Sequence, residues 1–113
     1  MPRIPMQFHG PAQLSNAAAT KFTVPAGERY VVRLIHVQNP SGAIVTFTLS
    51  KGADAAATRK WDAFPIPAQA SGETENVKEF WVYFVFEAGE ILQAFAGTNN
   101  ILTITIVGER HIL

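Results

Sequence analysis

Turn residues divide most of this sequence into short segments. Groups rich in glycine, proline and asparagine, such as VPAG, NPSG and EAGE, recur at intervals of roughly ten residues. The segments between them are rich in β-branched and aromatic residues, which favour strands over helices. The expected strands are residues 21–24, 29–38, 43–50, 77–86, 91–96 and 101–107. Short strands at this spacing predict an all-β sandwich or barrel.

Length and composition restrict the chain further. Its 113 residues match the size of one domain and are enough to bury a core. Cysteine is absent, which excludes disulfides, a zinc–thiolate site and a cysteine nucleophile. The longest wholly apolar run, residues 80–86, is far shorter than the roughly 20 residues of a membrane-spanning helix. No apolar run of signal-peptide length follows the N-terminus, so we expect a soluble chain with no membrane contact.

The charges are divided unevenly along the chain. Residues 1–60 contain seven Lys and Arg but two acids, whereas residues 61–113 contain two Lys and Arg and seven acids. Two interpretations follow. Either the two halves attract each other between copies of the chain, or strands from the two halves lie side by side and neutralise each other within one molecule. The zero net charge predicts no nucleic-acid partner, which would require a basic patch.

Two segments alternate between apolar and other residues. We expect residues 43–50 and 101–107 to cover the core with one face and to meet solvent with the other. Thr48 and Ser50 belong to the face expected to meet solvent. The expected inner positions are Ala43, Val45, Phe47 and Leu49 in the first segment and Leu102, Ile104 and Ile106 in the second.

Three other segments, residues 29–38, 80–86 and 90–96, are apolar on both faces. Successive side chains of a strand point to opposite faces, so something other than a single core must cover the second face. Strict alternation sets Tyr30, Val32 and Leu34 against Val31, Ile35 and Val37, and Phe80, Val82, Phe84 and Phe86 against Trp81, Tyr83 and Val85.

A second copy of the chain would bury such a face without requiring a different partner. Exposing Trp81, Tyr83 and Val85 together would leave a patch of the kind that marks an interaction site. Closed homo-oligomers are the commonest way to bury a face of this type. The predicted contact residues are Tyr30, Trp61, Phe80, Trp81, Tyr83 and Phe95.

The remaining segments have less pattern. Residues 1–20 contain three prolines and are expected to form an extended arm, which leaves residues 21–113 as a single sandwich domain. Residues 53–64 are expected to form a loop with at most one turn of helix. A long exposed connection is expected over residues 65–76.

Nothing in the sequence predicts catalysis or a cofactor. His9, His36 and His111 lack the spacing of a metal site, and His36 is expected to be a packed histidine within a strand. The acidic residues lie at turns, where they cap amides or keep edges soluble. There is no phosphate-binding glycine loop and no nucleophile elbow. Trp61 and Trp81, together with the two tyrosines, could instead form a platform that stacks on sugars.

The sequence resembles a group of small virion proteins of tailed bacteriophages. The similar elements are the VPAG turn, the YVV strand, the GADAAATR segment, the block FWVYFVFEAGEILQAFAGT and the final strand LTITIVG. They run from about Lys21 to Gly108. The resemblance implies a small antiparallel β-sandwich, of jelly-roll type, that is built into the particle and has no catalytic residues.

The resulting hypotheses belong to different classes. The first is a non-enzymatic virion protein made in the host cytoplasm, either a tail or tail-tip component or a capsid decoration protein. It would contact itself, with a trimer as the expected state, and other virion proteins. The second is a carbohydrate-binding module that uses exposed tryptophan and tyrosine. A small jelly-roll enzyme is the third, and a stoichiometric metal in the purified protein would be needed to support it.

Overall fold

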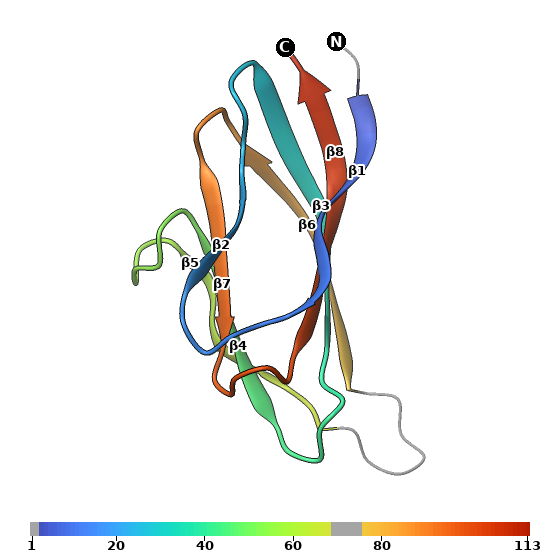
Figure 1. Cartoon of the computed structure of the whole chain (residues 1–113), viewed down its shortest axis with the longest axis vertical. Coiled ribbons are helices and arrows are strands. Elements are labelled where there is room, and N and C mark those ends of the chain that lie inside the picture. The colour runs from blue at the N-terminus through green and yellow to red at the C-terminus, as the bar shows by residue number, and fades with distance from the viewer. Residues whose placement is uncertain (1–2, 69–75) are drawn as a thin grey trace.

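The computed structural model describes residues 3–68 and 76–113, and these form eight strands (Figure 1). The described residues contain no helix. The strands are β1 (Arg3–Gln13), β2 (Ala19–Thr23), β3 (Glu28–Gln38), β4 (Val45–Lys51), β5 (Arg59–Ile66), β6 (Val77–Phe86), β7 (Ile91–Ala96) and β8 (Thr103–Ile112).

The strands form two four-stranded sheets that pack face to face (Figure 1). One sheet has the order β1-β8-β3-β6 and the other β2-β7-β4-β5. All paired strands are antiparallel. Most successive strands lie in opposite sheets, as in the two-sheet jelly roll. The structure therefore confirms the predicted all-β class and the antiparallel β-sandwich.

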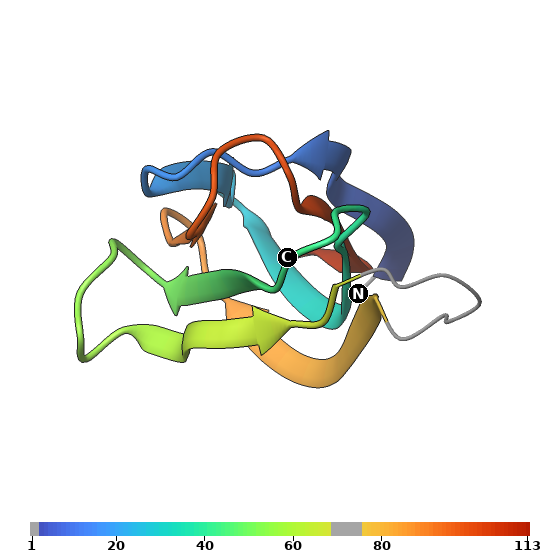
Figure 2. The ribbon, with the colours of Figure 1, turned by 90° about the horizontal axis from the view of Figure 1, so that it is seen from below.

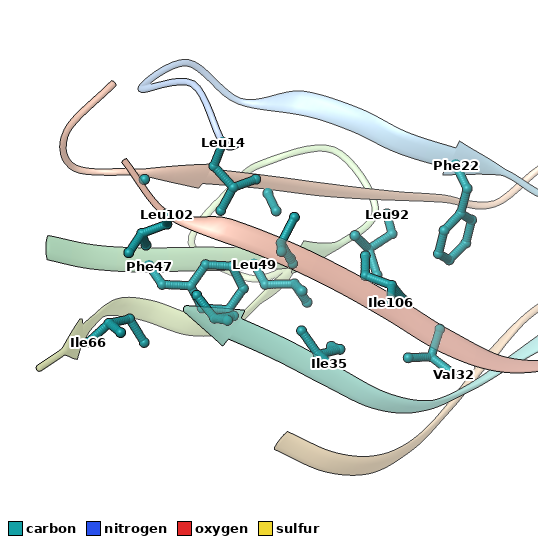
Figure 3. Packing of buried hydrophobic residues seen from close by; sticks show 14 of the residues in the cluster. Leu14, Phe22, Val32, Ile35, Phe47, Leu49, Ile66, Leu92, Leu102 and Ile106 are labelled. Carbon is teal, nitrogen blue, oxygen red and sulfur yellow. The ribbon is translucent and has the colours of Figure 1, made fainter. Parts of the chain in front are cut away.

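The hydrophobic core lies between the two sheets (Figure 3). Phe47 and Leu49 of β4 and Ile104 and Ile106 of β8 are fully buried there, which confirms the inner positions predicted within these two strands. The prediction of Ala43 as an inner position is wrong, because Ala43 precedes β4 and is exposed. Aromatic side chains close one end, where the Phe22 ring lies edge-on at 5.0 Å from the Phe86 ring. This packing is the main source of stability, since the chain has no disulfide.

The second face of β4 differs from the prediction, because Thr48 and Ser50 are buried rather than exposed to solvent. The chain after β4 turns back over this face, and the Ser50 hydroxyl donates a hydrogen bond to Asp54 Oδ1 at 3.1 Å. The amide of Ala63 donates to Thr48 Oγ1 at 3.0 Å. The alternation alone could not predict this cover, because it comes from a neighbouring segment.

Strand β3 does not alternate strictly. The assignment of Leu34 to the face of Tyr30 and Val32 is wrong, and so is the assignment of Ile35 and Val37 to the opposite face. The pairing of β3 with both β6 and β8 shifts register between Val32 and Leu34. The resulting bulge places Arg33 and Leu34 on the outer face in succession. Ile35 and Val37 then return to the core, where both are fully buried.

The N-terminal segment is extended and lies along its own molecule. Arg3–Gln13 pairs with β8 as the edge strand β1, with register shifts on either side of His9. Phe8 packs against the core and Leu14 is fully buried within it. Residues 3–14 of the predicted arm thus form part of the sandwich.

Strand β5 was expected to be a loop. Its sequence, RKWDAFPI, has proline, three charged residues and no clean alternation, and Ala63 has a positive φ of 50°. Pairing with β4 holds it in the sheet despite two register shifts. Strand β8 also extends to Ile112, beyond the predicted end at residue 107, because β1 and β3 pair on both sides of it. Residues 69–75 of the predicted connection lie outside the described residues.

Candidate interaction surface beside strand β6

The outer face of the sheet β1-β8-β3-β6 carries two large exposed aromatic side chains. Trp81 is 74% exposed and Tyr83 is 65% exposed. They are two residues apart on β6 and therefore point to the same side. Phe80, Val82 and Phe84 point the other way, against the core. The predicted division of β6 into an inner and an outer face is confirmed.

The bulge in β3 places a cation beside these aromatic side chains. The Arg33 guanidinium carbon lies 5.2 Å from the centre of the Tyr83 ring, within the range of a cation–π interaction. Its Nη1 atom also donates a hydrogen bond to Glu109 Oε1 at 3.3 Å. The neighbouring residue, Leu34, pairs with Trp81 in the sheet.

An open groove of about 510 Å³ crosses this face from β1 to β6. Most of its lining is apolar, and Gln7 and Arg33 are its polar side chains. The residues that line it are Pro5, Met6, Gln7, Arg33, Leu34, Trp81, Val107 and Gly108. All four strands of the sheet contribute, so the groove exists only in the folded sheet.

Ion pairs on this sheet join the basic and acidic parts of the chain. Glu109 lies 3.3 Å from Arg33 and 3.6 Å from Arg3, and Glu28 lies 2.8 Å from Arg110. Each pair links residues 1–60 with residues 61–113. They favour the interpretation that the uneven charges neutralise within one molecule. At partly exposed positions such as these, each pair contributes about 1 kcal/mol or less.

The six predicted contact residues are not brought together. Trp81 and Tyr83 lie on the outer face, whereas Tyr30 is only 6% exposed and stacks on Phe8 at 4.4 Å. Trp61 and Phe80 are half-buried between the sheets, with ring centres 4.5 Å apart. Phe95 belongs to the other sheet, where the Arg59 guanidinium lies 5.8 Å from its ring.

Sequence reasoning missed the residues that surround the two exposed aromatics, namely Gln7, Arg33 and Leu34. Residues 3–13 were not predicted as a strand, and strict alternation cannot predict a bulge. The available signal was Arg33 itself, a charged residue inside the apolar run YVVRLIHV.

A polar cluster lies at the other sheet, around the chain that follows β4. Arg59 Nε donates to Asp54 Oδ1 at 2.9 Å and its Nη1 donates to Asp62 at 3.0 Å. The hydrogen bond from Arg59, with a smaller contribution from Ser50, holds the pKa of Asp54 below its ordinary value. These contacts hold the loop against β4, so we assign them a structural role.

The histidine and acidic side chains of the described residues do not cluster as metal ligands would. Within residues 3–68 and 76–113, no group of three or more metal-ligating side chains gathers in one place. His9 Nε2 is buried and has no hydrogen-bond partner among the residues that the structure describes. Burial, together with nearby Lys21, lowers the pKa of His9 below its usual value. No helix in the described part of the chain is long and apolar enough to cross a membrane.

Comparisons with known proteins place few constraints on the chain. No family model matches it, and no curated protein sequence matches it. Among solved structures it is similar to a pentameric capsid protein isolated from metagenomic phage sequences, with 22% sequence identity and a TM-score of 0.32. The match covers 96% of this chain and 62% of that protein, so this chain spans less than two thirds of its length.

Proposed function

We propose that this chain is a non-enzymatic structural subunit of a bacteriophage particle, and that it associates with further copies of itself. The observation that carries the proposal is the exposure of Trp81 and Tyr83, at 74% and 65%, beside an apolar groove. Exposed aromatic area of this kind is characteristic of protein interfaces. The resemblance of residues 21–108 to small phage virion proteins is the reason for proposing that the assembly is a phage particle.

The finer assignment also belongs to this proposal. A tail or tail-tip position is preferred and capsid decoration is the alternative, with other virion proteins as additional neighbours. The trimer expected from the resemblance stays a prediction. An arm over residues 1–20 that reaches another subunit is not proposed again, because residues 3–14 pair with β8 and pack in their own molecule. The jelly-roll fold by itself selects none of these, because capsid proteins, lectins and cupins all use it.

Carbohydrate binding is the second candidate function, and the position of Trp81 favours it. A flat, exposed ring at the margin of a groove that contains Gln7 and Arg33 could stack on a sugar and supply hydrogen-bond donors. Trp61 would not contribute to this platform, because its ring packs 4.5 Å from that of Phe80.

The solution mass of the intact chain tests the proposal. Light scattering behind size exclusion, over a hundredfold range of concentration, should give a multiple of the 12.3 kDa chain mass. Deletion of residues 1–20 is not a suitable variant, because it would remove Leu14 and Phe8 from the core. A chain that stays monomeric throughout and binds glycans through Trp81 would replace the structural proposal with the second candidate.

A further inference from the structure

Each sheet ends in two edge strands, and three of these four edges are poorly suited to pairing with another strand. Natural edge strands avoid such pairing by being short or by containing prolines and bulges. β1 contains Pro5 and Pro11 and two register shifts, and β5 contains Pro65 and two register shifts. β2 is only five residues long.

Strand β6 is neither short nor interrupted by proline. It is ten residues long, contains no proline, and its side chains alternate from Glu79 to Phe86 between the exposed and the core side. Among the described residues it pairs with β3 alone, and that pair has one register shift, where β6 advances three residues from Trp81 to Phe84 while β3 advances two. Figure 2 shows β6 along the lower margin of the ribbon. Its outer edge is therefore open to another strand.

We propose that this edge pairs with the β6 edge of a second copy of the chain. The pairing rests on the self-association proposed above and specifies its contact. Two antiparallel β6 strands related by a two-fold axis would join the four-stranded sheets into one sheet of eight strands. The axis passes beside Val82, so that Trp81 of one copy lies opposite Tyr83 of the second copy.

A second copy is the occupant because β6 is complementary to itself in this register. The outer row sets Trp81 opposite Tyr83 twice, and the inner row sets Phe80 opposite Phe84 twice; aromatic pairs are among the stronger cross-strand contacts. Glu79 lies opposite Val85, so no like charges face each other. A shift of two residues would instead set Trp81 opposite Val85, or Phe80 opposite Val82.

The inner row has further support on each copy. The ring of Trp61 on β5 lies 4.5 Å from that of Phe80 and 5.7 Å from that of Phe84. These two phenylalanines are packed from the core side yet remain partly exposed at the edge. A strand that pairs with β6 would cover this remaining area. Trp81 and Tyr83 would be covered in the same contact.

Cysteine cross-linking tests the register, because the chain has no cysteine of its own. An equal mixture of Glu79→Cys and Val85→Cys leaves every aromatic residue in place and sets the two thiols opposite each other. Under oxidation the mixture should form covalent dimer at least about tenfold faster than either variant alone, since opposite Cβ atoms lie within disulfide reach. Gln7→Cys, on the β1 edge of the same sheet, is the matched control. A mixture no faster than the single variants would overturn this register.

Charge substitutions distinguish the edge from the face of the sheet. Trp81→Lys with Tyr83→Lys places lysines opposite each other at the proposed contact and should raise the dimer Kd at least about tenfold. The double variant Leu34→Lys, Val107→Lys alters the centre of the same face. It should change the dimer Kd less than about threefold, because these residues lie on inner strands. If the double substitution impairs folding, the single variant Leu34→Lys is the control.

The outcomes separate the two proposals. An oligomer that persists in the Trp81→Lys, Tyr83→Lys variant but dissociates in the Leu34→Lys variant overturns the edge pairing and leaves self-association standing. A wild-type chain that is monomeric at every concentration overturns both. A mass of twice 12.3 kDa supports the two-fold pairing, whereas three times that mass supports the trimer and requires a different contact.

Discussion

The guanidinium carbon of Arg33 lies 5.2 Å from the centre of the Tyr83 ring, and this contact joins a central strand to an edge strand. The bulge between Val32 and Leu34 is what turns Arg33 outward next to Leu34. The same bulge in β3 therefore brings the cation to the exposed Tyr83 ring and places Arg33 and Leu34 in the lining of the groove.

Replacing this cation should have a small but measurable effect. Arg33→Met should lower the free energy of unfolding by about 0.5–1 kcal/mol, because an exposed cation–π contact is of that size. Glu109→Gln is the comparison variant, since it removes the ion pairs of Glu109 with Arg33 and Arg3 while keeping the contact of Arg33 with Tyr83. Urea denaturation measures both. Equal effects of the two variants would assign the stabilisation to the ion pair instead.

Two exposed apolar side chains of similar exposure provide a matched test of self-association. Tyr83 is 65% exposed on β6 and Ile44 is 66% exposed before β4. Tyr83→Ser should weaken self-association several-fold, because interface aromatics contribute strongly, whereas Ile44→Ser should leave it unchanged. Sedimentation equilibrium gives both constants. Similar losses for the two variants would indicate non-specific association of apolar surface.

Gly108 should be intolerant of any side chain. A Cβ atom there would collide with the carbonyl oxygen of Val31 on β3 and touch the ring of Phe8 on β1. Gly108→Ala should therefore lower the free energy of unfolding by about 1–3 kcal/mol through overpacking. Gly42→Ala is the control, because nothing lies within 4 Å of its Cβ position. Thermal unfolding that ranks the two variants equally would contradict the strand spacing described for β8.

Asn39 should be important for stability, although it does not belong to the candidate interaction surface. Its side chain is fully buried, and Nδ2 donates to the carbonyl oxygens of Ala43 at 2.8 Å and Ile66 at 3.1 Å. Oδ1 accepts a hydrogen bond from the Ser41 amide at 3.0 Å. Asn39→Ala should cost about 1–3 kcal/mol of unfolding free energy, because these buried groups lose their partners. Ser41→Ala, which removes fewer bonds, should cost less in the same urea titration.

The pH dependence of stability should include a contribution from His9. Its folded pKa is below the ordinary value of 6.5, mainly because burial disfavours the charged form. Between the folded and the unfolded pKa the unfolded chain binds more protons, so stability falls as the pH is lowered from about 6.5 towards the folded pKa. His9→Gln should flatten this loss in urea midpoints measured from pH 8 to pH 5. An unchanged slope would show that other groups account for it.

Much of the sandwich follows from local sequence, and particular elements show why. In β4, β6, β7 and β8 the apolar positions recur with the two-residue period of a strand, and turn residues mark their ends. The inner faces of β4, β6 and β8 were therefore predictable, including the exposure of Trp81 and Tyr83. Strands β1 and β5 were not, since their prolines and charges suit an edge and their partners lie far away in the sequence.

By itself the sequence determined the all-β class, the positions of most strands and the presence of an apolar outer face on β6. These depend on side-chain period and turn chemistry, which are local properties. Only the tertiary structure decided the strand order, the bulge that places Arg33 over Tyr83, and the groove that four strands share. It also decided that β6, which is long and contains no proline, lies at the edge of its sheet. Each of these depends on pairing between residues distant in the chain, which no local pattern encodes.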